Sequence, residues 1–350
     1  MSVLDLIRPD LRDIKPYIPT GDELGVRLHA NELPWSPITF NQIPLNHYPK
    51  ALQQQQVQEL MADYFTVKSQ ELVLTRGSDD GIDLIMRLFL RAGTDSILQC
   101  PPTFPMYAFY ARLQQAQVLN CPLESENNFQ LSTEKLIDTW QPNCKLIMVC
   151  RPNNPTGSML GLQKIAGLCD YFTNKAVIVV DEAYIDFSET ESAATLLSSF
   201  DNLIILRTLS KACGLAGLRL GAVIAQPQLI QAIRNSMPPY TLSSAVIALA
   251  KNALANKEWF ATNIQYILNA RKSLITKLQQ SPWIETIYPS HTNFILVASS
   301  HAQSLSEWFA KHDIAVRHFA HRPLEHMMRI TVGDERQNER LLDTLNSFKP

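Results

Sequence analysis

The stretch AVIVVDEAY, residues 176–184, decides the fold of this chain. Its first five residues are apolar and mostly β-branched, which is typical of a buried strand. The run ends at Asp181, where acidic side chains and Tyr184 replace the apolar ones. A short apolar run of this kind predicts a strand inside a sheet, with polar residues at its carboxyl end.

Similar strand-like runs stand on both sides of this one and alternate with helical segments. We expect strands at 72–76, 96–100, 145–150, 203–206 and 220–225, and helices at 78–91, 103–114 and 162–171. Strands that alternate with helices predict an α/β fold in which helices cover both faces of one sheet. In such sheets, ligands bind beyond the carboxyl ends of the strands.

The two ends of the chain differ from this central part. The first 50 residues are rich in proline, which disfavours long helices and indicates an extended arm. Residues 243–280 are expected to be largely helical, followed by strands at 283–288, 293–297 and 329–332 and helices at 303–312 and 335–347. A chain of 350 residues exceeds the usual size of a single core. We therefore expect a large domain at 47–242, and an N-terminal arm with a smaller α+β domain at 1–46 and 243–350.

The composition excludes several classes of protein. With 31 Lys and Arg against 33 Asp and Glu, the net charge is −2, and 46% of the residues are hydrophobic. Such a chain is neither disordered nor a general binder of nucleic acid. Its N-terminus has no apolar signal-peptide core, and no run is long enough to span a membrane. The six cysteines form no CxxC pair, which favours reduced thiols in the cytoplasm.

Common cofactor and metal motifs are missing from the sequence. It contains no GxGxxG after a strand, no GxxxxGK[ST], no GxSxG and no HExxH. His318, His321 and His326 lie close together in sequence, but histidines without nearby carboxylates are a weak metal signal. We expect no metal site.

Polar motifs follow the expected strands at the point where each strand ends. The motifs are GSDDG at 77–81, RPNNPTG at 151–157, DEAY at 181–184, TLSK at 208–211 and GLAGLRLG at 214–221. Each motif alone is more often an ordinary turn, helix cap or surface pair. Their shared position predicts one crevice that receives side chains from several strand ends.

Taken together, these motifs resemble the fold-type I pyridoxal-phosphate-dependent aminotransferases, over nearly the whole chain. The histidinol-phosphate aminotransferases are the most similar branch. The resemblance rests on LHANELP at 28–34, HYPK at 47–50, TRGSDDGID at 75–83, CPPTFPMY at 100–107, RPNNPTG at 151–157, VVDEAYIDF at 179–187, LRTLSKACGLAGLRLG at 206–221 and MRITVGD at 328–334. It implies a mostly parallel seven-stranded sheet covered by helices, a smaller α+β domain and an N-terminal arm.

The resemblance also implies roles at the ring of pyridoxal 5'-phosphate. Lys211 would condense with the cofactor aldehyde and act as the acid and base of the reaction. Asp181 would pair with the pyridinium nitrogen, so that the ring can absorb carbanion charge. Asn154 and Tyr184 would hydrogen-bond the phenolic oxygen. Phe104 would stack on the ring, where the family more often has a tyrosine.

The phosphate and the substrates would be held by other residues of the same motifs. The phosphate cup would consist of Ser78, Asp79, Ser210 and Arg219, with Tyr48 reaching in from a neighbouring subunit of a homodimer. The substrate residues implied by the resemblance are Arg329 for the anionic tail, Asn31 from the arm, and Arg317 as a second anion contact.

The implied reaction is a ping-pong transamination in histidine biosynthesis. L-Histidinol phosphate and 2-oxoglutarate would give imidazole-acetol phosphate and glutamate. An aromatic amino acid aminotransferase and a threonine-phosphate decarboxylase share Lys211, Asp181 and Arg329, so they stay open as alternatives. A non-catalytic cofactor-binding module is a more remote one. The sequence departs from the family pattern at His29, Arg151 and Cys213.

Overall fold

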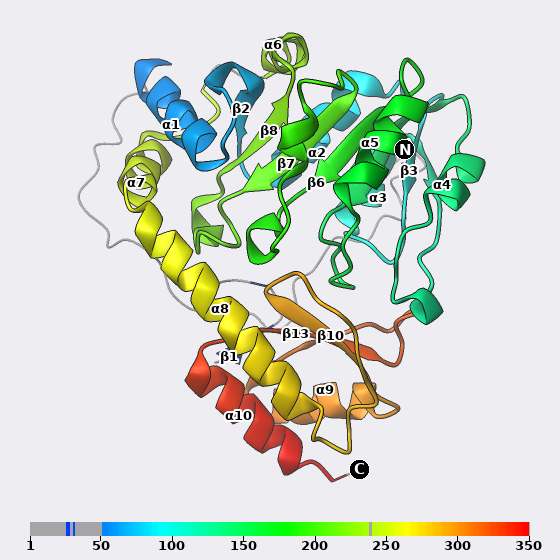
Figure 1. Cartoon of the computed structure of the whole chain (residues 1–350), viewed down its shortest axis with the longest axis vertical. Helices are drawn as coiled ribbons and strands as arrows, with labels where there is room; N and C mark the ends of the chain where they lie inside the picture. Colours follow the sequence, from blue (N-terminus) through cyan, green and yellow to red (C-terminus); the bar gives the residue numbers. More distant parts are fainter. Residues whose placement is uncertain (1–25, 29–30, 32–50, 238–239, 350) are drawn as a thin grey trace, which may run out of the picture.

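The computed structural model describes residues 26–28, 31, 51–237 and 240–349 (Figure 1). A large sheet and a small sheet lie one above the other in this view, and helix α8 runs beside both of them. Among the helices in these ranges, none is both long and apolar enough to cross a membrane.

The large sheet has seven strands in the order β2-β8-β7-β6-β5-β3-β4. The strands are β2 (Leu72–Thr75), β3 (Ser96–Gln99), β4 (Gln117–Asn120), β5 (Cys144–Cys150), β6 (Val177–Asp181), β7 (Leu203–Thr208) and β8 (Gly221–Ala225). The two pairs that β8 forms, with β2 and with β7, are antiparallel, and the other four pairs are parallel. The sheet is therefore mostly parallel, which confirms the fold predicted from the sequence.

Helices cover both faces of this sheet because successive strand residues point to opposite sides. One face packs against α2 (Ser78–Phe89), α3 (Met106–Leu113) and α6 (Pro227–Asn235). The other packs against α1 (Ala51–Tyr64), α4 (Thr133–Thr139), α5 (Leu162–Tyr171) and α7 (Ser244–Leu254). In β6, Ile178 and Val180 join the second core and Val179 joins the first.

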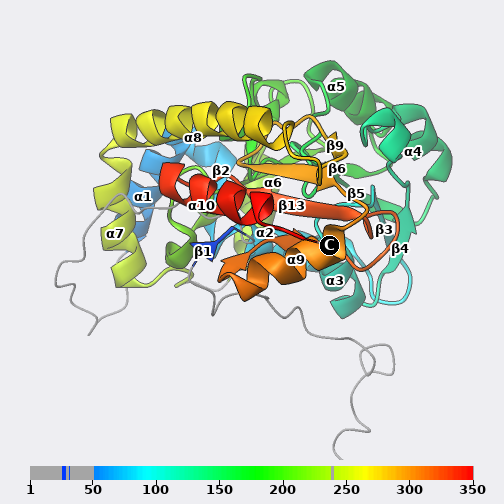
Figure 2. The same ribbon diagram turned by 90° about the horizontal axis from the view of Figure 1, so that it is seen from below.

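The small sheet is antiparallel, with the strand order β12-β13-β10-β9. Its strands are β9 (Thr286–Ile287), β10 (Phe294–Ala298), β12 (Arg317–His318) and β13 (Met327–Thr331). It packs with α8 (Lys257–Leu278), α9 (Ala302–Lys311) and α10 (Glu335–Asn346), and α10 lies between α8 and α9 (Figure 2). A separate strand pair joins β1 (Val26–Arg27) to β11 (Ile314–Ala315).

Some boundaries differ from the sequence prediction. The helix expected at 103–114 begins only at Met106, because prolines at 101, 102 and 105 surround its start. The helical stretch expected at 243–280 is divided into α7 and α8. At the division, the Asn256 side chain accepts a hydrogen bond from the Trp259 N–H (3.3 Å) and caps the start of α8. The expected strand at 283–288 shortens to Thr286–Ile287.

A buried ion pair joins the ends of two central strands. The guanidinium of Arg151, just after β5, lies 2.6 Å from the carboxylate of Glu182, just after β6, and both side chains are fully buried. Arg151 Nε also donates to the Leu160 carbonyl (2.7 Å), and Glu182 accepts from the Ala193 N–H (2.7 Å). Arg151 departs from the family pattern, and this ion pair gives it a structural role in fixing the two strand ends.

We expect Arg151→Met to lower the free energy of unfolding by about 3–5 kcal/mol, because it leaves Glu182 as a buried charge without its partner. Urea unfolding measures the loss. The double variant Arg151→Met/Glu182→Gln should recover part of it, since no buried charge is left behind. Lys135→Met is the control, because Lys135 and its partner Glu124 are both more than half exposed. Equal losses in Arg151→Met and Lys135→Met would contradict this role.

Candidate active site

The register of the central strands brings their carboxyl ends to one edge. Asp181, the last residue of β6, pairs with Cys150 of β5 on one side and with Leu206 of β7 on the other. The antiparallel β8 begins at the same edge, where Gly221 pairs with Thr208. A cavity at this edge is lined by Ser78, Asp79, Phe104, Cys150, Asn154, Asp181, Ala183, Tyr184, Thr208, Ser210, Lys211 and Arg219.

A buried carboxylate occupies one part of this cavity. Asp181 is 2% exposed and accepts hydrogen bonds from the Tyr107 hydroxyl (2.8 Å) and from the Ala183 N–H (3.1 Å). The pKa of Asp181 is raised to about 6, mainly by burial and in smaller part by the nearby carboxylates of Asp79 and Glu182, against the opposing effect of its two donors. Such a group suits a cationic ring nitrogen, whose charge would favour the carboxylate form.

Asn154 and Tyr184, which also line the cavity, belong to a hydrogen-bonded series of polar side chains. The Tyr184 hydroxyl accepts from the amides of Asn31 (3.1 Å) and Asn154 (3.3 Å). Arg329 Nη1 in turn donates to the Asn154 carbonyl oxygen, and Thr331 donates to Asn31 (2.8 Å). These hydrogen bonds thus link the N-terminal segment, the large sheet and the small sheet. Burial raises the pKa of Tyr184 above its ordinary range, which keeps the hydroxyl neutral.

Lys211 lines the same cavity as Asp181 and Tyr184. It follows β7 in the turn that begins with Leu209 and Ser210, and it lines the cavity. Its Nζ lies 5.8 Å from the centroid of the Tyr184 ring. A lysine amine at this place can act on a group that reaches Asp181 on one side and Tyr184 on the other.

The third part of the cavity is suited to an anion. Helix α2 begins here at Ser78, so its free N–H groups and its positive dipole end face the site. Arg219 approaches from the other side and donates to Ser210 Oγ (3.4 Å) and to Asp79 Oδ2 (3.3 Å). Gly77 precedes the helix with a φ of 82°, a conformation that glycine adopts without strain.

These three parts fit pyridoxal phosphate. The fit rests on the buried carboxylate of Asp181, which suits the ring nitrogen, and on the α2 N-terminus with Arg219, which suits the phosphate. Lys211 and the amide of Asn154 lie in the same cavity. Each charged group on which the fit rests has a partner of opposite charge on the cofactor: the ring nitrogen for Asp181 and the phosphate for Arg219.

The remaining predicted residues lie around or beyond this cavity. Phe104 lines it and packs edge-on against Tyr107, with ring centroids 5.7 Å apart. Arg317 lies directly opposite Arg329 in the small sheet, so both occupy one face of it. Arg317 lines a neighbouring cleft with His318. Tyr48 and His29 lie outside the described residues, and Cys213 is buried away from the cavity lining.

Sequence reasoning missed Tyr107, Cys150 and Thr208, which complete the site. Cys150 and Thr208 are the last residues of their strands, so their position alone could have indicated them. Tyr107 gave no local signal, because its partner Asp181 is 74 residues away in sequence. Across the described ranges, no group of three His, Cys, Asp or Glu side chains is arranged to hold a metal ion.

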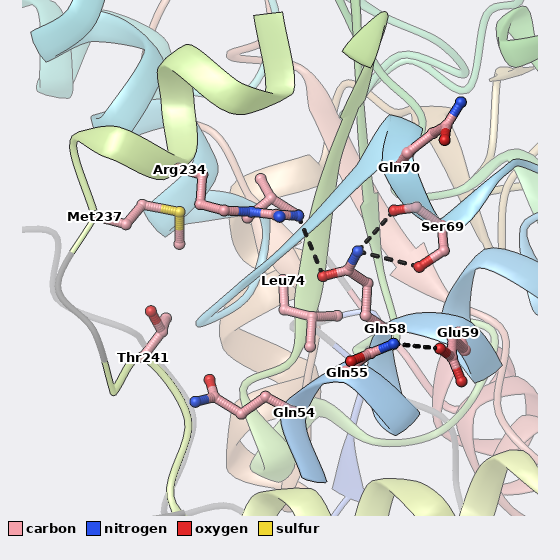
Figure 3. A pocket seen from close by; sticks show the side chains of 11 residues that line it. Gln54, Gln55, Gln58, Glu59, Ser69, Gln70, Leu74, Arg234, Met237 and Thr241 are labelled. Carbon is pink, nitrogen blue, oxygen red and sulfur yellow. Dashed lines mark hydrogen bonds between the residues drawn. The ribbon is translucent and has the colours of Figure 1, made fainter. Parts of the chain in front are cut away.

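A second, larger cavity lies away from the strand ends, between α1, β2 and the end of α6 (Figure 3). Its lining is mostly uncharged and polar, with Gln58 donating to the Ser69 carbonyl (2.6 Å) and accepting from Arg234 (3.4 Å). None of the residues that follow the carboxyl ends of the central strands line it. The chemistry of the motifs is therefore confined to the cavity around Lys211.

Known proteins are similar to this chain in sequence and in fold. The family model of class I and II aminotransferases matches residues 39–345. Histidinol-phosphate aminotransferase 1 of Legionella pneumophila (strain Lens) is 50% identical over 349 residues, which cover 99% of this chain and 96% of the relative. The histidinol-phosphate aminotransferase of Blochmanniella floridana is 36% identical, with 98% of each chain covered.

Among solved structures, the histidinol-phosphate aminotransferase of Sinorhizobium meliloti in complex with pyridoxal-5'-phosphate has a similar fold. Its TM-score is 0.85 at 20% sequence identity, with 97% of each chain covered. This likeness concerns the fold.

We expect Gly221→Ala to destabilise the protein by about 1–3 kcal/mol and to weaken anion binding at the start of α2. A Cβ at this position would lie 2.8 Å from the Arg207 carbonyl oxygen and from the Gly77 carbonyl carbon, and 2.9 Å from the Ser78 nitrogen. These are backbone atoms, so β8 and α2 must separate. Gly217→Ala is the control, since its Cβ meets no atom within 4 Å. Urea unfolding and phosphate binding should distinguish the two variants; equal behaviour would refute the close approach.

We expect Asp181→Asn to stabilise the ligand-free protein at pH 8 by about 3 kcal/mol. The folded-state pKa of about 6 lies above the ordinary value of 3.8, so the folded protein binds this proton more strongly than the unfolded chain. The resulting stability is complete below about pH 4 and is lost as the pH rises through 6. Urea unfolding from pH 4 to pH 8 should show a difference between wild type and variant that grows across this window. The exposed Asp138→Asn should show no such growth.

Proposed function

The chain belongs to the family of class I and II aminotransferases, and we propose that it transfers an amino group between L-histidinol phosphate and 2-oxoglutarate with pyridoxal phosphate as cofactor. The observation that carries this proposal is the 50% identity to a histidinol-phosphate aminotransferase along the whole chain. The geometry around Lys211 supports it, since the groups proposed to bind the cofactor from the described part of the chain line one cavity.

Each residue of the cavity has its own proposed role in the reaction. Bound pyridoxal phosphate supplies an electron sink for the negative charge that develops on the substrate α carbon. Asp181 holds a proton on the ring nitrogen, which strengthens that sink. The Lys211 amine takes the proton from the α carbon and later returns it. Asn154 and Tyr184 would hold the phenolic oxygen of the cofactor, and Phe104 would stack on its ring.

The phosphate of the cofactor is held by the start of α2 together with Ser210 and Arg219. Backbone N–H groups at Ser78 and Asp79 donate to the anion, and the dipole of the helix favours its charge. Arg219 presents a planar guanidinium that binds two oxygens at once. The hydrogen bond from Arg219 to Ser210 holds both side chains toward this place.

Arg329 is the proposed anchor for the anionic end of both substrates. Arg329 is 9% exposed, and its guanidinium donates to Asn154 and lies 5.2 Å from the centroid of the Phe294 ring. A guanidinium binds a phosphate or a carboxylate bidentately, so one arginine serves both substrates. Asn31 closes the site from the N-terminal segment, and Arg317, on the same face of the sheet, is the proposed second anion contact.

We propose that the enzyme works as a homodimer in the cytoplasm. In the single chain, the Arg219 side chain is 51% exposed and Asp79 is 36% exposed, although both belong to the anion site. A second copy that brings in its Tyr48 would cover this side of the site. The large sheet and its covering helices other than α7 would form the domain at 47–242, and the remaining parts of the chain the smaller domain and the arm.

An absorption titration of the purified, cofactor-loaded enzyme tests the substrate. L-Histidinol phosphate is expected to bleach the visible band of the bound cofactor at a concentration at least about tenfold lower than phenylalanine or threonine phosphate, because binding its phosphate and imidazole together is worth at least 1.4 kcal/mol more. Equal bleaching by phenylalanine would instead indicate an aromatic aminotransferase, and release of carbon dioxide from threonine phosphate a decarboxylase. A wild-type protein that binds no cofactor would refute the enzyme itself.

The same titration of single-residue variants tests which side chains take part in the reaction. Lys211→Ala should abolish the visible band, because no other amine lines the cavity among the described residues. Arg329→Leu should raise the concentration needed for half-bleaching about 100-fold for both histidinol phosphate and glutamate, since about 3 kcal/mol of charged hydrogen bonds are lost. The exposed Arg87→Leu serves as the control.

A further inference from the structure

The buried hydroxyl of Tyr107 is a polar group that the proposed mechanism does not yet use. Tyr107 lies in the first turn of α3, and its side chain has no exposed surface. Its hydroxyl donates to Asp181 Oδ2 at 2.8 Å. A phenylalanine would fill the same apolar space, so the packing of α3 on the sheet does not explain why a hydroxyl is present here.

Tyr107 touches two of the groups that would contact the cofactor ring. Its hydroxyl meets Asp181, and its own ring packs edge-on against Phe104 with an interplanar angle of 81°. Asp181 is therefore held between Tyr107 on one side and the Ala183 N–H (3.1 Å) on the other. Both carboxylate oxygens are engaged, which fixes the rotation of the carboxyl group.

We infer that Tyr107 is a positioning residue, which keeps the Asp181 carboxylate charged and aimed at the ring nitrogen of the cofactor through its hydrogen bond. This inference rests on the proposed function and deepens it. It assigns to α3 a part in the reaction that neither Lys211 nor the strand-end motifs supply.

The electrostatic surroundings explain why this hydrogen bond matters. The groups that act on Asp181 besides its two donors are negative, namely the carboxylates of Asp79 from α2 and Glu182 beside it. The thiol of Cys150 and the hydroxyl of Tyr184 are also close. Burial and these charges raise the pKa of Asp181, and the hydrogen bond from Tyr107 is the largest opposing cause.

Loss of this donor has a defined consequence. A single proton is shared between Asp181 and the ring nitrogen, and the Tyr107 hydroxyl favours the arrangement in which the carboxylate is charged and the nitrogen carries the proton. Without the hydroxyl, the proton moves toward the carboxyl group. The ring then attracts electrons less strongly, and the removal of the substrate proton by Lys211 slows.

The test compares Tyr107→Phe with wild type in the cofactor-loaded enzyme, with pyridoxal phosphate labelled with ¹⁵N in its ring. At neutral pH, the ¹⁵N signal of the variant should move toward the value of an unprotonated pyridine. We expect kcat to fall about tenfold while KM for glutamate changes less than twofold. The matched control is Tyr110→Phe, which removes a half-buried hydroxyl from the same helix. An unchanged ¹⁵N signal in Tyr107→Phe overturns the inference.

A second measurement follows Asp181 itself in enzyme labelled with ¹³C at the aspartate carboxyl groups, with Asp181→Asn identifying the signal. Tyr107→Phe should raise the midpoint of its titration by about one to two pH units, because a hydrogen bond to a charged group is lost. Site-specific replacement of Tyr107 by 3-fluorotyrosine keeps the fold and the hydroxyl but makes it a stronger donor, so it should lower the midpoint. Equal midpoints in all three proteins refute the role of Tyr107. A wild-type enzyme without any cofactor signal refutes the proposed function instead.

Discussion

The buried carboxylate of Asp181 is the constraint on which the rest of the site depends. It stands at the end of a central strand, where almost no water reaches it, and burial there disfavours its charge. The fold compensates only in part, with one hydroxyl and one backbone N–H. The site therefore favours a ligand that brings positive charge to this place, and a protonated pyridine ring does so. Local stability is lower in the ligand-free protein for the same reason.

A series of hydrogen bonds connects the proposed cofactor region to the proposed substrate region. One series of hydrogen bonds joins four residues from different parts of the fold: Asn31, Tyr184, Asn154 and Arg329. They come from the N-terminal segment, from the segments that follow β6 and β5 of the large sheet, and from the small sheet. An anion that binds Arg329 thus acts on the residue that holds Asn154 and, through it, on the Tyr184 hydroxyl. In the proposed mechanism, this arrangement would couple substrate binding at Arg329 to the electronic state of the cofactor.

The central strands were predictable because their signals are local. The apolar run before Asp181 is nearly the strand that forms, Val177–Asp181, and the run at 145–150 differs from Cys144–Cys150 by one residue. Helix boundaries were less predictable where a cap or a proline decides them. The division between α7 and α8 depends on one asparagine cap, and the start of α3 depends on the prolines before it. Neither changes the apolar periodicity that the prediction used.

The sequence by itself determined the α/β fold and the polar residues at the strand ends, because apolar periodicity and the position of a residue after a strand are properties of short segments. The kind of chemistry followed from the resemblance of these motifs to those of a known family. Tertiary structure alone decided which side chains meet. Tyr107 and Asp181 are 74 residues apart, Arg151 and Glu182 are 31 apart, and Asn31 and Tyr184 are 153 apart. Such pairs form because helices and sheets pack in one relative orientation and because a buried polar group requires a partner. Neither condition can be recognised in a short stretch of sequence.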